Sequence, residues 1–175
     1  MMGSNSLSRQ NTTPHTPNPI PLPIRTISLH NLSERYRAQG KYAEMEPLCQ
    51  LALEIQEQTL GPEHFEVAIT LSDLAEAYHL QGKYAKAEPL YNRSLTIWEK
   101  TLGKEHPRVA TTLSNLAKLY AVEGNYPQAE QLYLRALAIQ KKTLGPDHQD
   151  VALNLKHLAE LYHRWSLATL LRTTG

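Results

Sequence analysis

The order of apolar and polar residues repeats at an interval of 42 residues from about residue 26 onward. Two register positions show this repeat, leucine at Leu29, Leu71, Leu113 and Leu155, and tyrosine at Tyr36, Tyr78, Tyr120 and Tyr162. Self-similarity at a period between about 20 and 50 residues indicates a solenoid or a related array of stacked units. The pattern therefore predicts a chain built from one supersecondary element that is used several times.

The spacing inside one unit is helical. In residues 106–124 the apolar side chains of Leu113, Leu116, Ala117 and Tyr120 fall at i, i+3, i+4 and i+7, which is one face of a helix. Glycines recur every 21 residues, half a unit, and glycine is favoured directly after the C-terminus of a helix. Each unit is therefore predicted to be two antiparallel helices, here called helix A and helix B.

Prolines fit this division because they fall near predicted helix starts. Pro107 is expected at the first helical position, where the missing N–H is not needed. Pro47 and Pro89 are expected near the first turn of their helices B, where a proline is better tolerated than in the middle.

The boundaries follow from the same register. An array over residues 25–175 divides into repeats at about 26–67, 68–109 and 110–151, with a partial repeat at 152–172. Ser166 replaces the expected glycine, so the last helix is predicted to continue to about Leu171 as a cap. Residues 1–24 are rich in Pro, Ser, Thr and Asn and are predicted to be a disordered tail. The segment Pro14–Pro17 also fits a P-x-x-P ligand, although a plain flexible tail is the stronger interpretation.

The repeated residues resemble the tetratricopeptide repeat in its 42-residue form, as found in the kinesin light chain. The residues that carry this resemblance recur over about residues 26–165, and in the second copy they are Leu74, Ala75, Tyr78, Gly82, Tyr84, Ala87 and Tyr91. The resemblance implies an all-α fold, a right-handed α-α superhelix of helix pairs. It also implies a scaffold whose concave surface binds a peptide or a partner protein.

A candidate groove can be placed on the helices A. With 100° per residue, a stripe beside the core face of each helix A is expected to line the concave side. The candidate residues of this stripe and its edge are His30, Asn31, Glu34, Arg37, Ser72, Asp73, Glu76, His79, Ser114, Asn115, Lys118, Ala121, Lys156, His157, Glu160 and His163. Their mixed charge favours a polar, extended ligand, and a solvated surface without a ligand is the alternative. The carboxylate clamp of some family members needs asparagine where Glu34, Glu76, Lys118 and Glu160 stand, so that clamp is not expected.

Composition and charge exclude several classes of function. The chain has 18 basic and 17 acidic residues, and this balance gives no electrostatic footprint for nucleic acid. No apolar run is long enough to cross a bilayer, and the N-terminus has no signal-peptide pattern, so a cytoplasmic protein without membrane contact is expected. The lone Cys49 cannot form an internal disulfide and is expected to be buried packing.

No residue pattern predicts catalysis, a metal or a cofactor. His64, His106 and His148 recur one repeat apart, so they are expected to lie too far apart to bind one ion and to close the loop before each helix A. His157 and His163 are not spaced as in the zinc motif H-E-x-x-H. The leading interpretation is therefore a binding module that is not an enzyme, with an unrecognised catalytic site as a remote rival.

Both ends of the array depart from the repeat. Met45 and Cys49 stand where alanine and tyrosine are expected, which suggests an end repeat packed on one side. At the other end, Trp165, Leu167, Leu170 and Leu171 lie where a missing helix B would cover the array. This apolar end makes self-association, as a structural assembly module, the main alternative function. A fragment of a longer multi-repeat protein is a further alternative.

Overall fold

The computed structural model describes the backbone of residues 22–173, and this part of the chain consists of seven α-helices without strands. The helices are α1 (Leu22–Ala38), α2 (Tyr42–Leu60), α3 (Phe65–Leu80), α4 (Tyr84–Leu102), α5 (Pro107–Val122), α6 (Tyr126–Leu144) and α7 (Gln149–Thr173). None of these helices is long and apolar enough to span a membrane.

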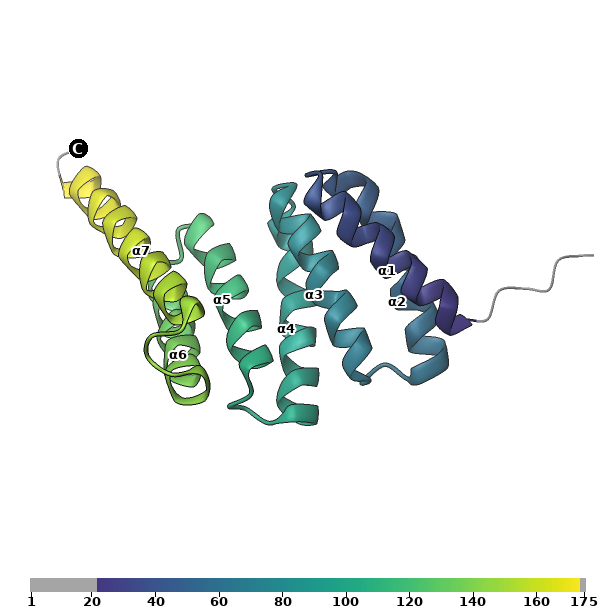
Figure 1. The fold of residues 1–175 in the computed structure, drawn as a ribbon. Coiled ribbons are helices and arrows are strands. Elements are labelled where there is room, and N and C mark those ends of the chain that lie inside the picture. Colours follow the sequence, from purple (N-terminus) through teal and green to yellow (C-terminus); the bar gives the residue numbers. More distant parts are fainter. Residues whose placement is uncertain (1–21, 174–175) are drawn as a thin grey trace, which may run out of the picture.

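Each helix packs against the next one along the chain, which gives three helix pairs and a final single helix (Figure 1). The helices A are α1, α3, α5 and α7, and the helices B are α2, α4 and α6. Contacts also join α3 to α5 and α5 to α7, so the helices A stand side by side in a row. The predicted all-α solenoid is confirmed.

The N-terminal boundary differs from the sequence prediction. Helix α1 begins at Leu22, so residues 22–24 belong to the helix and not to the predicted tail. Pro23 does not prevent this, because the first turn of a helix tolerates proline. The remaining tail, residues 1–21, and the P-x-x-P segment lie outside the described residues. The later repeat boundaries also shift, since α3, α5 and α7 each begin about three residues before the predicted divisions.

The prediction for two prolines was wrong. Pro47 and Pro89 lie inside α2 and α4, five residues after the helix starts at Tyr42 and Tyr84, and so beyond the first turn. Proline at such a position removes one hydrogen bond of the helix backbone. Both prolines are exposed, so water can reach the carbonyl group that loses its donor.

Small and large side chains alternate in the core between helices A and B. Ala87 and Tyr91 on α4 are buried together, and so are Ala129 and Tyr133 on α6. At the same register positions of α2, Met45 and Cys49 are also fully buried, which differs from the expected one-sided packing. In the first repeat a larger residue, Met45, therefore replaces alanine, and a smaller one, Cys49, replaces tyrosine. The two replacements roughly conserve the total side-chain volume, which a close-packed core requires.

The loops before α3, α5 and α7 end in a histidine that caps the following helix. The Nδ1 atoms of His64, His106 and His148 accept hydrogen bonds from the backbone N–H groups two residues on, at 3.3, 3.2 and 3.1 Å. Each bond satisfies one of the free donors at a helix N-terminus. Glycine is required earlier in these loops, as at Gly103, whose φ of 88° and ψ of 156° disfavour other residues.

Helix α7 shows a bare face that α3 and α5 do not show. Leu71 and Leu113 are completely buried, whereas the register-equivalent Leu155 is 45% exposed. Tyr162 is 45% exposed for the same reason, because no helix B follows α7 among the described residues. The shared register of the leucines therefore does not give them the same burial, since Leu29 is half-buried and Leu155 is exposed.

Candidate functional site

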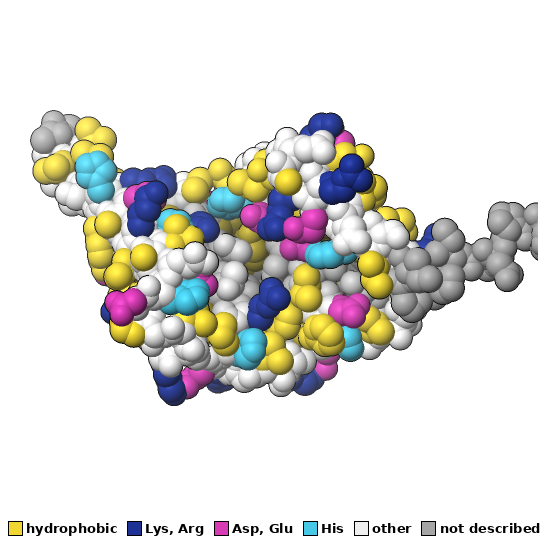
Figure 2. Space-filling view, viewed as in Figure 1, with side chains coloured by type: hydrophobic (Ala, Val, Ile, Leu, Met, Phe, Trp, Pro, Cys, Tyr) yellow, Lys and Arg dark blue, Asp and Glu magenta, His cyan; other side chains and the backbone are white. Residues whose placement is uncertain are grey.

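Three cavities of the described chain lie on the surface formed by the helices A, which we call the helix A face. A further hollow lies apart from them, beside Tyr162, Trp165 and Leu170 near the C-terminal end of α7. One cavity of about 240 Å³ lies between α1 and α3, and cavities of about 140 and 260 Å³ lie between α5 and α7. Figure 2 shows this surface hollowed near the middle of the row, with acidic and basic side chains gathered over α1 and α3. The helix A face is therefore the candidate binding surface.

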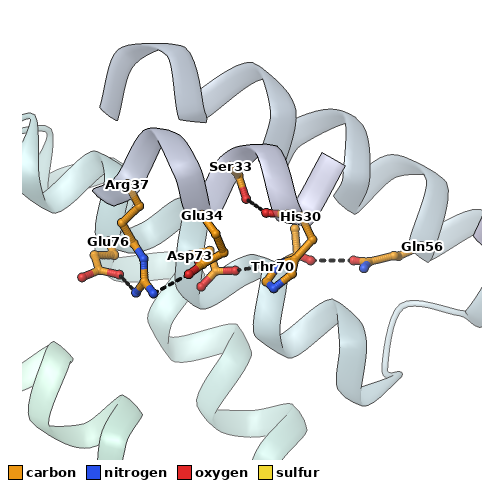
Figure 3. A network of polar contacts seen from close by, with 8 residues as sticks. All are labelled: His30, Ser33, Glu34, Arg37, Gln56, Thr70, Asp73 and Glu76. Carbon is orange, nitrogen blue, oxygen red and sulfur yellow. Dashed lines mark hydrogen bonds and ion pairs between the residues drawn. The ribbon is translucent and has the colours of Figure 1, made fainter. Parts of the chain in front are cut away.

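A cluster of charged groups joins α1 to α3 (Figure 3), and we call it the acid–base cluster. Arg37 donates hydrogen bonds to Glu34, at 2.6 Å, and to Glu76 across the helix pair, at 3.3 Å. His30 Nδ1 lies 3.6 Å from Asp73 Oδ2. The cluster thus sets three carboxyl groups against one guanidinium. With His30 neutral, Glu34 and Glu76 already outnumber Arg37, and ionisation of Asp73 adds a further negative charge.

Burial acts strongly on one member of the acid–base cluster. It raises the pKa of the Asp73 carboxyl to about 6, with His30 and Arg37 opposing the rise and Glu34 and Glu76 adding to it. The pKa of Arg37 is also raised, because Glu34 and Glu76 outweigh the effect of burial. Desolvation of a carboxylate without enough compensating donors is the general cause of such a rise for an acid.

Part of the acid–base cluster has the composition of a metal site. His30, Glu34 and Asp73 each offer one ligand atom, and these atoms lie within 4.8 Å of one another. Imidazole and carboxylate ligands suit several divalent transition metals. Glu34 already forms an ion pair with Arg37, however. The positive charge of this guanidinium beside the ligand atoms disfavours the binding of a metal cation. We therefore describe the cluster as a polar network and assign no metal to it.

The cavity of about 140 Å³ between α5 and α7 differs from the cavity between α1 and α3, because several of its polar atoms lack a hydrogen-bond partner among the described residues. We call it the polar cavity. It is lined by Thr111, Ser114, Asn115, Lys118, Gln140, Asp150, Leu153, Asn154 and His157. Ser114 Oγ, Asn154 Oδ1 and His157 Nδ1 are buried there without a hydrogen-bond partner among the described residues. Such atoms are rare in native proteins, because each unsatisfied group carries a desolvation penalty.

The neighbouring cavity of about 260 Å³ continues the same surface toward the C-terminal end of α5. His79, Lys118 and His157 line it, and His79 Nδ1 is the fourth buried atom without a partner in the described chain. Burial lowers the pKa of both imidazoles, and the Lys118 ammonium lowers both further. Burial also lowers the pKa of Lys118 itself, with Glu76 opposing. This end of the helix A face therefore holds desolvated groups that can donate hydrogen bonds.

The structure brings most of the predicted groove residues to the helix A face. His30, Glu34, Arg37, Asp73 and Glu76 form the acid–base cluster, and His79, Ser114, Asn115, Lys118, Ala121, His157 and Glu160 line cavities on α5 and α7 or beside them. Asn31 is exposed on α1.

Three other predicted residues line none of these cavities. Ser72 turns toward a helix B, because its Oγ lies 2.8 Å from Ser94 Oγ on α4. Lys156 and His163 are exposed on α7 and line none of the three cavities. The residues of α7 that do line these cavities include Asn154, His157 and the predicted Glu160.

Several residues that line the cavities lie outside the stripe predicted from the sequence, notably Gln56, Gln140, Asn154 and Arg164. Two of them come from helices B, which the stripe on the helices A does not include. The sequence does mark three of these residues, because they differ from their equivalents in other repeats. Gln56 and Gln140 share a register position with Trp98, and Asn154 shares one with Thr70 and Thr112.

Comparison with protein families gives a match along almost the whole array. The tetratricopeptide repeat model matches residues 25–100, 66–142 and 108–167. These overlapping matches together cover more than half of the chain.

Solved structures agree with this family match. The crystal structure of "kinesin light chain nearly identical TPR-like repeats" from Podosopora anserina is 32% identical with a TM-score of 0.73, over 82% of this chain and 68% of that one. BtubC (BKLC) from P. vanneervenii is 24% identical with a TM-score of 0.74, over 82% of this chain and 57% of its own length. The Sgt2 TPR domain from Aspergillus fumigatus is 18% identical with a TM-score of 0.61, over 82% of this chain and 81% of its own length. At these identities, BtubC and the Sgt2 domain support the fold alone.

Proposed function

Because the chain belongs to the tetratricopeptide repeat family, in its kinesin light chain-like type, we propose that its helix A face binds a segment of a partner protein. Repeats of this family generally mediate protein–protein interaction, and the family is one of non-catalytic scaffolds. The proposed module therefore carries no catalytic activity of its own, and its proposed compartment is the cytoplasm.

One observation carries this proposal. All four buried polar atoms without a partner among the described residues, on His79, Ser114, Asn154 and His157, belong to residues that line the two cavities between α5 and α7. A stable scaffold gains nothing from unsatisfied buried groups, because each one lowers the free energy of unfolding. A bound partner that supplies the missing hydrogen bonds would recover that loss on binding.

The charges of the helix A face indicate what kind of segment it would bind. Carboxylates are in excess at the α1–α3 end, where Arg37 is shared between Glu34 and Glu76. Lys118 forms no ion pair among the described residues at the α5–α7 end. An extended, polar segment of mixed charge is complementary to both ends, since opposite potentials steer and orient a partner.

The experiment is an affinity capture from a lysate of the source cell, read by mass spectrometry. The intact protein is compared with the face variant Glu76→Lys with Lys118→Glu. The matched control is Glu63→Lys with Lys100→Glu, which reverses an exposed ion pair away from the helix A face and makes the same number of charge changes.

We expect a protein that the intact chain and the control retain and the face variant loses. The purified captured protein should then bind the face variant at least about tenfold more weakly, since reversing two contacting charges costs more than 1.4 kcal/mol. If all three chains retain the same proteins with the same affinity, the helix A face is not the binding surface. Circular dichroism of each variant confirms that helicity is unchanged.

A further inference from the structure

The repeat register explains why cavities open at two places along the row. Gln56, Trp98 and Gln140 occupy the same position in the three helices B. Trp98 is buried in the apolar cluster that joins α3 and α5, and Arg108 lies over its ring at 5.8 Å. Gln56 and Gln140 instead line the cavities of about 240 and 140 Å³. A glutamine in place of tryptophan therefore leaves open the volume that the indole fills in the middle of the array.

The two cavities differ in how their polar groups are satisfied. In the first cavity, Thr70 Oγ1 donates a hydrogen bond of 2.7 Å to Gln56 Oε1. In the polar cavity, Asn154 stands at the position of Thr70 and donates from Nδ2 to Gln140 Oε1, at 3.0 Å, and to the carbonyl of Tyr133, at 3.3 Å. Both of its amide hydrogens are thereby used, so the unpaired atom Oδ1 is an acceptor that needs a donor.

Ser114 is left unpaired for a reason that the repeat also makes visible. Its register equivalent Ser72 pairs with the hydroxyl of Ser94 on α4, at 2.8 Å. Ala136 stands at the corresponding position of α6, so Ser114 has no such hydroxyl beside it. Lys118 adds an ammonium group that makes one long hydrogen bond, 3.5 Å, to Asn115 Oδ1 among the described residues. The polar cavity thus lacks a donor for Asn154 and an acceptor for Lys118 and Ser114.

This combination discriminates between ligand groups. A carboxylate or phosphate offers only acceptors, so it leaves Asn154 Oδ1 unpaired and also meets Asp150 in the cavity wall. An ammonium or guanidinium group offers only donors and meets the Lys118 ammonium. An apolar group leaves every polar atom unsatisfied. A hydroxyl group offers a donor and an acceptor, but on a single oxygen atom. A primary carboxamide offers them on two atoms, an N–H₂ group for Asn154 and a carbonyl oxygen for Lys118 and Ser114.

The volume of the polar cavity fits such a group. About 140 Å³ corresponds to roughly four or five water molecules at about 30 Å³ each. The side chain of asparagine or glutamine has a similar number of heavy atoms, whereas a peptide backbone could enter only with its side chains.

We propose that the polar cavity between α5 and α7 receives the carboxamide of an asparagine or glutamine side chain from the partner segment. This inference rests on the proposed function, and it names the side chain that anchors the partner. Asn154 accepts from the carboxamide nitrogen, and Lys118 and Ser114 donate to its oxygen.

The experiment selects short random peptides from a display library on the full chain. A variant with Gln140→Trp and Asn154→Thr closes the polar cavity by reproducing the native pair Trp98 and Thr112. The control is the ion-pair reversal Glu63→Lys with Lys100→Glu, which leaves every cavity on the helix A face unchanged. We expect selected peptides to share Asn or Gln at one position and to bind the double variant at least about tenfold more weakly, with affinity retained by the control.

The outcomes separate this inference from the proposed function. Peptides that bind the helix A face without an Asn or Gln preference overturn the carboxamide anchor and leave the proposed function standing. Peptides that bind the double variant as tightly as the native chain also overturn the carboxamide anchor and leave the proposed function standing. If no selected peptide binds the helix A face, both fail. An NMR titration of the unmodified chain needs no variant: acetamide should shift the amide signals of Ser114, Lys118 and Asn154 more than acetate does, and equal shifts would contradict the anchor.

Discussion

At the scale of single residues, Asp73 shows how a side chain can depart from the repeat at a cost to stability. Asparagine occupies the same register position at Asn31 and Asn115, so the fold tolerates a neutral amide there. Asp73 instead holds a largely buried carboxyl whose pKa is raised to about 6 by burial. A charge kept in an unfavourable place is a candidate for function and not for stability.

The substitution Asp73→Asn should raise the free energy of unfolding at neutral pH. The native carboxyl has a pKa of about 6 and an ordinary one about 3.8, so between these values the native state binds more protons than the unfolded state. Stability contributed by Asp73 therefore falls as pH rises through this window and stays low above it. Removing the carboxyl should stabilise the protein by on the order of 2–3 kcal/mol at pH 7 and by much less near pH 4.

Urea unfolding at several pH values measures this effect. The control is Asp147→Asn, since Asp147 is an exposed acid in a loop and no comparable change is expected there. If the Asp73→Asn variant is less stable than the native chain across the whole pH range, the favourable interactions of the Asp73 carboxylate contribute more free energy than its desolvation costs.

At the scale of helices, the same sequence pattern gives different environments. Leu71 on α3 and Leu155 on α7 occupy the same register position, but a following helix B covers only the first. Most helix features could be read from the sequence, because helix period and glycine position are local properties. The position of Pro47 within α2 was not predicted closely, because helix boundaries are the least reliable part of a sequence-based prediction.

The leucine pair gives a direct comparison. Leu71→Ala should lower the free energy of unfolding by about 2–5 kcal/mol, because the residue is completely buried and its removal leaves a cavity. Leu155→Ala should cost less than about 1 kcal/mol, because the side chain is 45% exposed. Chemical denaturation of both variants measures the difference. Equal losses would mean that another helix covers the bare face of α7 in solution.

At the scale of the whole molecule, stability should vary along the row of helices. Each repeat contacts only its neighbours, so an array of this kind behaves as a chain of local stabilities. Helices α3, α4 and α5 have packed neighbours on both sides, whereas α1 and α7 have them on one side. The part of α7 beyond Tyr162 carries the exposed Leu167, Leu170 and Leu171.

Hydrogen–deuterium exchange should follow this order. We expect the slowest amide exchange in α3, α4 and α5 and the fastest in α1 and in α7 beyond Tyr162, because local opening is easiest where fewest contacts are lost. Mass spectrometry of peptic fragments measures it. Strong protection at the end of α7 would instead indicate self-association through that surface, and repeating the measurement at lower protein concentration would separate the two explanations.

The sequence by itself determined the helical period, the antiparallel pairing of helices A and B, and the family, because these depend on local spacing that recurs in every repeat. It also placed His30, Glu34, Arg37 and Glu76 on one side of their helices, since a stripe follows from 100° per residue. Only the tertiary structure decided that Ser72 pairs with Ser94 and that Leu155 is exposed. It also decided that Ser114 Oγ and Asn154 Oδ1 line one cavity without a hydrogen-bond partner among the described residues. Hydrogen-bond partners and cavity volumes depend on which side chains neighbouring helices present, and in this chain those are the residues that differ between repeats.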